Sequence, residues 1–137
     1  MSRLKLAVVG AGHLGRIHAR LANDAENIQL QVVVDPVVGT REQLAEQLQT
    51  QSLGDYRELF GQVDAAIVAS PTSTHVEVVS ELLRGGVHVL VEKPITTTVA
   101  EADQLVSLAR QQQLVLQVGH VERFNPALTS VRDRLAD

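Results

Sequence analysis

Residues 4–21 read LKLAVVGAGHLGRIHARL, and this stretch decides the fold. Its apolar beginning, from Leu4 to Val9, predicts a short buried strand. Apolar residues then recur at helical spacing, which predicts a helix from about His13 to Asn23. A strand, a glycine-rich turn and a helix in this order are typical of a unit that binds a dinucleotide.

Three glycines in the turn have separate expected roles. Gly10 permits the tight turn, Gly12 lets the backbone approach a pyrophosphate, and Gly15 lets the helix pack close to the strand. The helix then presents unpaired N–H groups and a partial positive charge to the phosphates. His13 lies on this turn, where phosphate contact and solvent exposure are both consistent with the sequence. The alternative for the whole motif is a glycine-rich loop with a structural role only.

Asp35 identifies the expected cofactor more closely. It follows a predicted strand at Leu30 to Val34 and lies twenty positions after Gly15. A carboxylate at this place binds the adenosine ribose hydroxyls and repels a 2′-phosphate, so NAD is predicted. NADP is the alternative, because Arg41 is close enough in sequence to meet a 2′-phosphate. The role favoured for Arg41 is that of a solvated residue in the first turn of a helix.

The rest of the chain alternates predicted strands with predicted helices. Further strands are expected at residues 51–53, 63–69, 88–91 and 114–118. Helices are expected to begin at three capping boxes, namely Thr40 with Gln43, Thr74 with Glu77, and Thr98 with Glu101. Two more are expected to be capped by Asp55 and by Asn125-Pro126, the last carrying Leu128, Val131 and Leu135 on one face. This alternation predicts an α/β fold with a doubly wound parallel sheet of the Rossmann type.

The composition excludes several functional classes. The chain of 137 residues has the size of one domain, and its net charge of -4 argues against nucleic-acid binding. Without cysteine it can form no disulfide, no thiolate zinc site and no cysteine nucleophile. No histidine pair has the spacing of a zinc motif, so no metal site is expected. No apolar run reaches membrane-spanning length, and we expect a cytoplasmic protein without a membrane partner.

Polar residues follow three of the later predicted strands. Ser70 to His75 come after the strand at 63–69, Glu92-Lys93-Pro94 after the next strand, and Gly119-His120 after the last. Ligands of an open α/β sheet bind at the carboxyl ends of its strands. We therefore expect these side chains to share one site at that edge of the sheet.

Lys93 is the candidate catalytic residue at this edge. Oxidation of a secondary alcohol moves a hydride to a nicotinamide and a proton to a base, and the cofactor carries the hard step. A lysine ammonium beside the hydroxyl stabilises developing charge on oxygen and can relay the proton. The residues alone leave an alternative equally open, in which Lys93 pairs with a carboxylate at the surface. His120 is a candidate for contact near the nicotinamide, whereas His18 and His88 are expected to be packing or surface residues.

Five features of the chain occur in a specific order and spacing. They are Gly10 to Gly15, Asp35, Ser70-Pro71 with His75, Glu92-Lys93-Pro94, and the segment GHVERFNP at residues 119–126. Together they resemble the N-terminal half of the glucose–fructose oxidoreductase/inositol dehydrogenase (Gfo/Idh/MocA) family, and they span nearly the whole chain. Members of this family are NAD(P)-dependent dehydrogenases that act mainly on sugars, polyols and nucleotide sugars.

The resemblance implies roles for the residues that match the family pattern. It places the glycine turn on the pyrophosphate, Asp35 on the adenosine ribose, and Lys93 beside the nicotinamide ribose and the substrate. It favours the catalytic role of Lys93 over the surface pair and suggests that the Lys93–Pro94 peptide is cis. From their positions and from the resemblance together, the full set of expected cofactor contacts is Gly10, Gly12, His13, Leu14, Gly15, Asp35, Ser70, Pro71, Thr72, His75, Glu92, Lys93 and His120.

Residues 1–120 are interpreted as the NAD(P)-binding domain and residues 121–137 as the start of a linker helix toward a substrate domain. The family's second domain has no match in this chain, so we expect the chain alone to be incomplete for catalysis. The expected substrate is a carbohydrate-type small molecule, and residues 119–126 are similar to those of dehydrogenases that oxidise the 3-hydroxyl of UDP-N-acetylglucosamine. Two alternatives stay open, a non-catalytic dinucleotide sensor and an assembly module that forms a homo-oligomer through exposed apolar faces.

Overall fold

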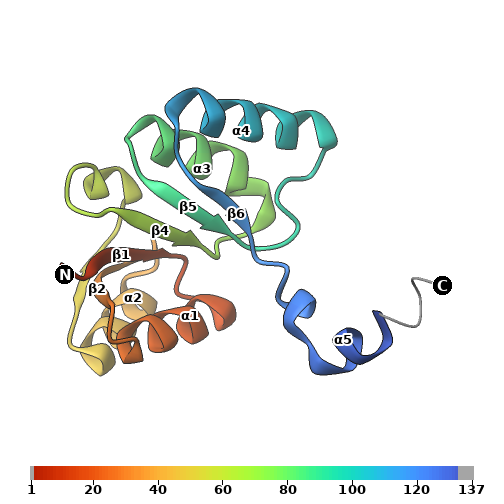
Figure 1. Cartoon of the computed structure of the whole chain (residues 1–137). Coiled ribbons are helices and arrows are strands. Elements are labelled where there is room, and N and C mark those ends of the chain that lie inside the picture. The colour runs from red at the N-terminus through yellow and green to blue at the C-terminus, as the bar shows by residue number, and fades with distance from the viewer. Residues whose placement is uncertain (1, 133–137) are drawn as a thin grey trace.

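A computed structural model of the chain describes residues 2–132. Its strands form one sheet in the order β3-β2-β1-β4-β5-β6 (Figure 1), and every pairing in it is parallel. The strands are β1 (Leu4–Val9), β2 (Ile28–Val34), β3 (Gln51–Leu53), β4 (Ala65–Val68), β5 (His88–Val91) and β6 (Leu116–Val118). The predicted doubly wound sheet of the Rossmann type is confirmed, because the strand order reverses between β1 and β4.

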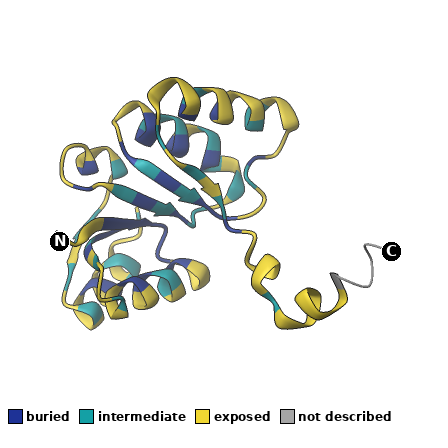
Figure 2. Ribbon diagram, in the orientation of Figure 1, coloured by how far each residue is buried: buried dark blue, intermediate teal, exposed yellow. Residues whose placement is uncertain are grey.

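Helices cover both faces of the sheet (Figure 1). On one face lie α1 (His13–Asp24) and α2 (Val38–Leu48), and on the other lie α3 (His75–Arg84) and α4 (Val99–Gln112). Three short helices connect elements, and they are η1 (Tyr56–Leu59), η2 (Thr72–Thr74) and η3 (Val121–Phe124). The last helix, α5 (Pro126–Arg132), stands away from the sheet and is mostly exposed (Figure 2). None of the helices within residues 2–132 is long and apolar enough to cross a bilayer.

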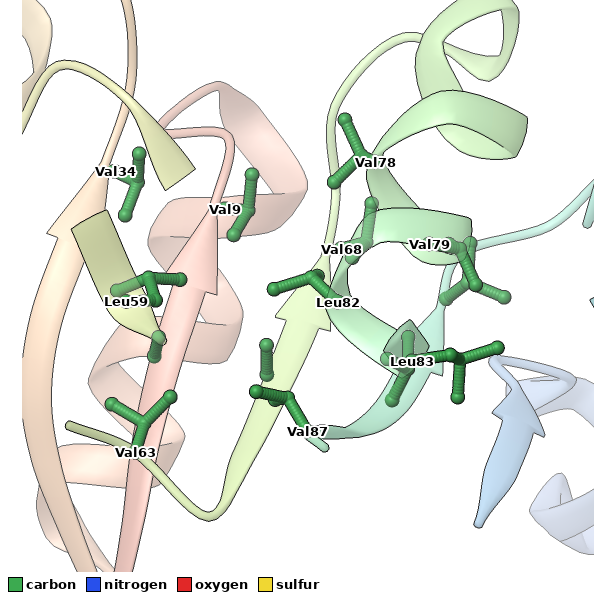
Figure 3. Packing of buried hydrophobic residues seen from close by; sticks show 14 of the residues in the cluster. Val9, Val34, Leu59, Val63, Val68, Val78, Val79, Leu82, Leu83 and Val87 are labelled. Atoms are coloured by element: carbon green, nitrogen blue, oxygen red, sulfur yellow. The ribbon is translucent and has the colours of Figure 1, made fainter. Parts of the chain in front are cut away.

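The core consists of two apolar layers, one on each face of the sheet. The layer beneath α3 and α4 is built mainly of valine and leucine (Figure 3), including the fully buried Leu82, Leu83 and Leu105. The layer beneath α1 and α2 includes Val33 and Leu44. Successive residues of a strand point to opposite faces, so β1 contributes to both layers. Burial on both faces explains why the strands read as continuous apolar runs rather than as alternating ones.

The predicted strand boundaries are close to the observed ones. β1 and β5 have the predicted bounds, and the weakly indicated edge strand at Gln51–Leu53 is confirmed as β3. β2 begins two residues earlier than predicted, at Ile28, while β4 and β6 are shorter than the apolar runs that contain them. The prediction for Leu135 lies outside the described residues.

Three of the predicted N-terminal caps are confirmed. The Thr98 hydroxyl accepts from the Glu101 N–H at 3.3 Å, and the Glu101 carboxylate accepts from the Thr98 N–H at 3.0 Å, which completes the capping box of α4. Asp55 accepts from the N–H two positions later and starts η1. Asn125 does the same at the start of α5, where Pro126 is the first helical residue.

The capping boxes predicted for α2 and α3 are wrong. α2 begins at Val38, ahead of Thr40, and no side chain within residues 2–132 caps it. Before α3, the Thr74 hydroxyl donates to the Pro71 carbonyl at 2.8 Å and lies 2.7 Å from the Ser70 hydroxyl. The short helix η2 precedes α3 directly, so this hydroxyl serves the turn rather than the N-terminus of α3.

Candidate functional site

The glycine turn between β1 and α1 is shaped by close backbone approaches. Gly10 has a φ of +97°, in the left-handed region, and a Cβ there would lie 2.7 Å from the Ala69 carbonyl carbon. A Cβ at Gly15 would lie 1.7 Å from the Gly10 carbonyl oxygen, so α1 packs directly against the turn. A Cβ at Gly12 would meet nothing within 4 Å. Gly10 and Gly15 are therefore required by packing, whereas Gly12 faces open space that a ligand can enter.

The N-terminus of α1 opens onto that space. Gly12 is its N-cap residue, and no side chain within residues 2–132 bonds to the first turn. The side chains of His13 and Leu14, which begin the helix, are exposed. The first N–H groups of a helix have no intrahelical acceptor, and the helix dipole gives them a partial positive charge. This geometry suits the phosphates of a dinucleotide.

Asp35 is held at the carboxyl end of β2 by two backbone hydrogen bonds. Its Oδ2 accepts from the Ala11 N–H and its Oδ1 accepts from the Val37 N–H, each at 2.8 Å. Charge-assisted bonds of this kind fix both the position and the orientation of the carboxylate. The side chain is half-buried, and each carboxylate oxygen keeps a further lone pair for a ribose hydroxyl.

Arg41 contacts the turn that follows β2, which begins with Asp35 and Pro36. Its guanidinium donates to the backbone carbonyls of Asp35 at 3.2 Å and Pro36 at 3.3 Å. These contacts satisfy one of its nitrogens, and its other N–H groups can still meet an anion. Arg41 is half-buried rather than fully solvated, and it stays a candidate for contact with a 2′-phosphate.

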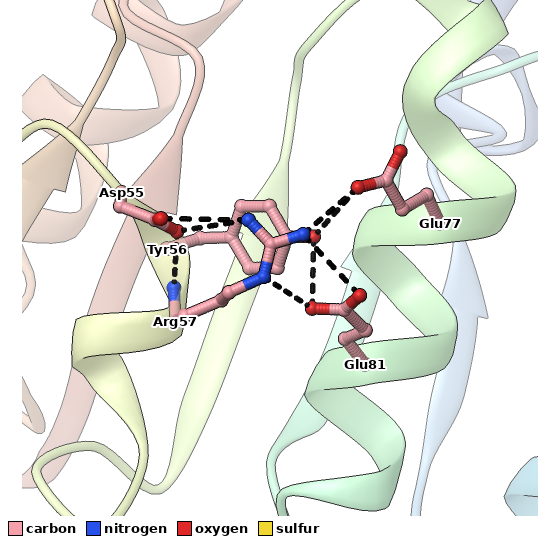
Figure 4. Close-up of polar contacts among 5 residues, drawn as sticks. All are labelled: Asp55, Tyr56, Arg57, Glu77 and Glu81. Carbon is pink, nitrogen blue, oxygen red and sulfur yellow. Dashed lines mark hydrogen bonds and ion pairs between the residues drawn. The ribbon is translucent and has the colours of Figure 1, made fainter.

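A cluster of charged residues around Arg57 joins η1 to α3 (Figure 4). Arg57 bonds to Glu81 at 2.9 Å, to Glu77 at 3.0 Å and to Asp55 at 3.4 Å. The Tyr56 hydroxyl donates to Glu81 at 3.0 Å, and the Arg57 guanidinium lies 4.8 Å from the centre of the Tyr56 ring. Burial, followed by the hydrogen bond to Glu81, raises the pKa of Tyr56. The hydrogen bond to Glu81 likewise raises the pKa of Arg57.

The glycine turn, Asp35 and part of this cluster line one cleft of about 790 Å³, which we call the cofactor cleft. The predicted cofactor contacts that line it are Gly10, Gly12, His13, Leu14, Asp35, Ser70 and Pro71. Lining residues that sequence reasoning missed include Tyr56, Arg57 and Glu77. Arg57 lies 20 positions from Glu77, and no local pattern indicates such a contact.

His75 is buried below the turn that follows β4, with 1% of its surface exposed. Its Nε2 lies 2.9 Å from the Ser70 carbonyl oxygen. Its Nδ1 lies 3.1 Å from the carbonyl oxygens of both Pro94 and Ile95. The ring therefore bridges the turn after β4 and the segment after β5, and Thr72, on the same turn, is half-buried.

Glu92 is also buried, and it meets α1 across the edge of the sheet. Its Oε1 lies 2.6 Å from the His18 Nε2, and its Oε2 accepts from the Lys93 N–H at 3.2 Å. A Cβ at Gly119 would lie 3.1 Å from this carboxylate, which accounts for a glycine after β6. The contact between His18 and Glu92 spans 74 positions, so periodicity could not indicate it. His88 accepts from the Val115 N–H at 3.0 Å and has a structural role, as predicted.

A second cleft, of about 990 Å³, lies beside η3 and α5, and we call it the lysine cleft. Its lining is Lys93, Gln117, Val118, His120, Val121, Glu122, Arg123, Phe124, Leu128 and Thr129. Lys93 and His120 are both exposed in it, and the predicted cis Lys93–Pro94 peptide is confirmed. An ammonium and an imidazole in one cleft can bind and polarise a hydroxyl group.

Comparison with known proteins identifies relatives along nearly the whole chain. A model of an oxidoreductase family with an NAD-binding Rossmann fold, GFO_IDH_MocA, matches residues 4–120. UDP-N-acetylglucosamine 3-dehydrogenase of Acidithiobacillus ferrooxidans is 37% identical over 132 residues, which cover 96% of this chain and 42% of that protein. Rhizopine catabolism protein MocA of Rhizobium meliloti is 36% identical over 135 residues, which cover 97% of this chain and 42% of that protein.

Solved structures agree in fold. GenD2 from gentamicin A biosynthesis, in complex with NAD, is 29% identical and superposes with a TM-score of 0.95 over 100% of this chain and 40% of its own. The chain thus spans less than half the length of the relatives it matches.

Proposed function

The chain belongs to the Gfo/Idh/MocA oxidoreductase family, with its NAD-binding Rossmann fold, and from this premise we propose that it is the cofactor-binding part of an NAD-dependent dehydrogenase. The observation that carries the proposal is the doubly anchored Asp35 carboxylate beside the uncapped N-terminus of α1. A dinucleotide needs these two groups together, one for the ribose and one for the phosphates. NAD, when bound, accepts a hydride from the carbon of a secondary alcohol.

Lys93 is the proposed catalytic residue. It is exposed in the lysine cleft, at the carboxyl end of β5, and it shares that cleft with His120. Its ammonium would donate to the substrate hydroxyl and stabilise negative charge as the O–H proton leaves. His120 would contact the substrate or the nicotinamide from the end of β6. The proton that leaves the hydroxyl would pass to the His120 imidazole, which shares this cleft with Lys93.

NAD is proposed rather than NADP. Asp35 would repel a 2′-phosphate, and three further carboxylates line or border the far end of the cofactor cleft. The cation among them, Arg57, already bonds to Asp55, Glu77 and Glu81. The Arg41 nitrogen that faces this turn already donates to the backbone carbonyls of Asp35 and Pro36, so NADP binding would depend on its remaining N–H groups.

A sugar, a polyol or a nucleotide sugar is the proposed substrate class. Support comes from the similarity to UDP-N-acetylglucosamine 3-dehydrogenase of Acidithiobacillus ferrooxidans, which is 37% identical. We further propose that residues 1–120 form the cofactor domain and that residues 121–137 lead toward a substrate domain. The exposed Phe124 and Leu128 support this, because such apolar side chains are normally covered by further polypeptide or by a second copy in a homo-oligomer. A cytoplasmic location completes the proposal, supported by the absence of cysteine.

A thermal-shift titration of the chain with NADH and with NADPH tests the proposed cofactor. A ligand that binds only the folded state raises the melting temperature by mass action. We expect a larger shift with NADH than with NADPH, and we expect Arg41→Ala to leave the NADH shift unchanged. If NADPH gives the larger shift and Arg41→Ala abolishes it, Arg41 rather than Asp35 determines which dinucleotide binds. No shift with either dinucleotide would contradict the proposed function.

A further inference from the structure

The segment that carries Lys93 is ordered at both ends while its central residues are exposed. Glu92 is 6% exposed and Thr96 is 7% exposed, but Lys93 and Pro94 between them are exposed. An exposed loop residue does not ordinarily have a fixed backbone. Contacts on either side of Lys93 must therefore fix its backbone, from which the side chain extends.

The upstream contact comes from α1, on one face of the sheet (Figure 1). His18 lies 2.6 Å from Glu92, with side-chain exposures of 18% and 8% respectively. The other carboxylate oxygen of Glu92 accepts from the Lys93 N–H. One buried carboxylate thus connects the helix that follows the glycine turn to the backbone of Lys93, and Gly119 leaves room for it.

The downstream contact comes from α3, on the opposite face of the sheet (Figure 1). The ring of His75 lies between the Ser70 carbonyl and the carbonyls of Pro94 and Ile95. A carbonyl oxygen can only accept, so each ring nitrogen that carries a proton donates to the loop that it faces. The turn that begins with Ser70 lines the cofactor cleft, so this contact joins the cofactor cleft to the residues after Lys93.

We propose that His18 and His75 form a histidine clamp, a pair of positioning residues that hold Lys93 from the two faces of the sheet. The clamp connects Lys93 to the two turns that would bind the cofactor, the glycine turn through α1 and the Ser70 turn through His75. Ordering of either turn by a bound dinucleotide is thereby transmitted to the Lys93 backbone. The inference rests on the proposed function in one respect, namely that Lys93 acts on the substrate.

The sequence offers a direct readout of Lys93. It contains two lysines, Lys5 and Lys93, so reductive methylation with ¹³C-formaldehyde labels two side chains and the N-terminal amine. Lys5 lies in β1, near the N-terminal end of that strand, and serves as an internal reference. A Lys93→Arg variant assigns the signals by removing one of them. The ¹³C shift and line width of Lys93 then report its surroundings with and without NADH.

The matched variants are His18→Leu and His18→Gln. The amide of Gln can still donate to Glu92, whereas Leu fills similar space without a donor. We expect His18→Leu to shift the Lys93 signal toward that of Lys5 and to abolish its response to NADH, while His18→Gln restores both. The Lys5 signal should stay the same in every variant. A Lys93 signal in His18→Leu that is identical to that of the wild type would overturn the clamp.

The second half of the clamp is tested by His75→Gln, which keeps a donor toward Ser70 and loses the contact with Pro94 and Ile95. We expect this variant, measured at saturating NADH, to lose the response of the Lys93 signal to NADH. If it fails to fold, His75→Asn, whose shorter amide can take the place of Nδ1 as donor toward Pro94 and Ile95, tests the same contact, and loss of the Lys93 response in that variant would count against the clamp. If wild-type protein binds no NADH, the proposed function fails, while the ligand-free Lys93 signals of the two His18 variants still decide whether the clamp exists.

Discussion

The cofactor cleft and the lysine cleft lie along the same edge of the sheet but are built in different ways. The cofactor cleft depends on fixed backbone: a turn in which Gly10 and Gly15 leave no room for a Cβ, and a carboxylate anchored to two N–H groups. The lysine cleft is lined mainly by side chains, several of them exposed. The cofactor cleft is thus formed by groups that are fixed in the fold. In the lysine cleft the reactive side chains are exposed and are not part of the packed structure.

The contacts of His75 and Glu92 lie between the two clefts and connect them. His75 and Glu92 are buried and belong to the framework, but both touch the segment that presents Lys93. Substitutions of Gly10, Gly15 or Asp35 should therefore cost stability and binding together, whereas substitution of Gly12, which faces open space, should affect binding alone. Substitutions of exposed groups in the lysine cleft should spare both.

The largest effect is expected for Gly15→Ala. A Cβ there would lie 1.7 Å from the Gly10 carbonyl oxygen, and neither backbone segment can move without disturbing the sheet. We expect a loss of about 3 kcal/mol in the free energy of unfolding, at the upper end for overpacked sites. Urea denaturation followed by circular dichroism measures it.

Gly12→Ala is the matched control for that substitution. Gly12 has φ −69° and ψ −165°, which any residue adopts, and a Cβ there meets nothing within 4 Å. Stability should change by less than about 0.5 kcal/mol, as for other surface positions. The NADH-induced thermal shift should nevertheless fall, because the methyl group occupies the approach to the pyrophosphate. Equal destabilisation by both substitutions would contradict the different roles assigned to the two glycines.

Asp35→Asn is expected to have the next largest effect. The amide is neutral and has one acceptor oxygen in place of two, so one of the two N–H groups, of Ala11 or of Val37, loses its acceptor and faces an NH2 donor. We expect a loss of about 2 kcal/mol in stability. The preference for NADH over NADPH should shrink by about tenfold, equivalent to about 1.4 kcal/mol.

Asp103→Asn is the control for charge alone, since Asp103 is an exposed acid on α4. It should leave both the stability and the dinucleotide preference unchanged. A similar change in preference for the two variants would mean that net charge, rather than the anchored carboxylate of Asp35, selects the dinucleotide.

The difference between the clefts also explains what the sequence could predict. The glycine turn, Asp35 and the alternation of strands and helices depend on residues that are near in sequence and on apolar periodicity, and these are visible in one chain. The His18–Glu92 contact joins residues 74 positions apart, and the contacts of Arg57 with Glu77 and Glu81 join residues 20 and 24 positions apart. Such contacts depend on how α1, η1 and α3 pack on the sheet, which no local pattern specifies.

The capping boxes show the same limit on a smaller scale. Thr40, Thr74 and Thr98 each precede a glutamate or glutamine by three positions, yet the box forms at Thr98 alone among them. Thr74 lies in a turn that already uses its hydroxyl, and α2 has begun before Thr40 is reached. The pattern is necessary for a box, but the start of the helix is decided by the packing of the preceding loop.

Thr98→Ala, which alters the end of the segment that follows Lys93, should therefore cost about 1 kcal/mol in stability, as for other N-cap residues. Thr40→Ala, the matched control, should cost nothing, because Thr40 lies inside α2 and alanine favours helix. Thermal unfolding of both variants measures the contrast. Equal losses would mean that Thr40 makes a contact of the same strength as the observed cap.

The cap has a pH dependence whose sign follows from Glu101. Hydrogen bonds from Thr97, and then from Thr98, lower the pKa of the Glu101 carboxyl in the folded state. Because its folded pKa lies below its unfolded pKa, the contribution is present above the unfolded value and is lost as the pH falls through the folded value. The stability difference between the wild type and Thr97→Ala, which removes the hydroxyl that donates to the Glu101 carboxylate, should thus shrink in acid.

The smallest effect on stability is expected for Lys93→Met, and it separates the two clefts most clearly. Lys93 is exposed, so the free energy of unfolding should change by less than about 0.5 kcal/mol, and the NADH-induced thermal shift should stay the same. A loss comparable to that of Gly15→Ala would show that Lys93 is held in place for packing. A reacting group needs an ordered backbone, which the buried Glu92 and His75 contacts provide, and a side chain free to meet the substrate. Neutrality of Lys93→Met toward folding and cofactor binding is therefore what a dedicated catalytic position requires.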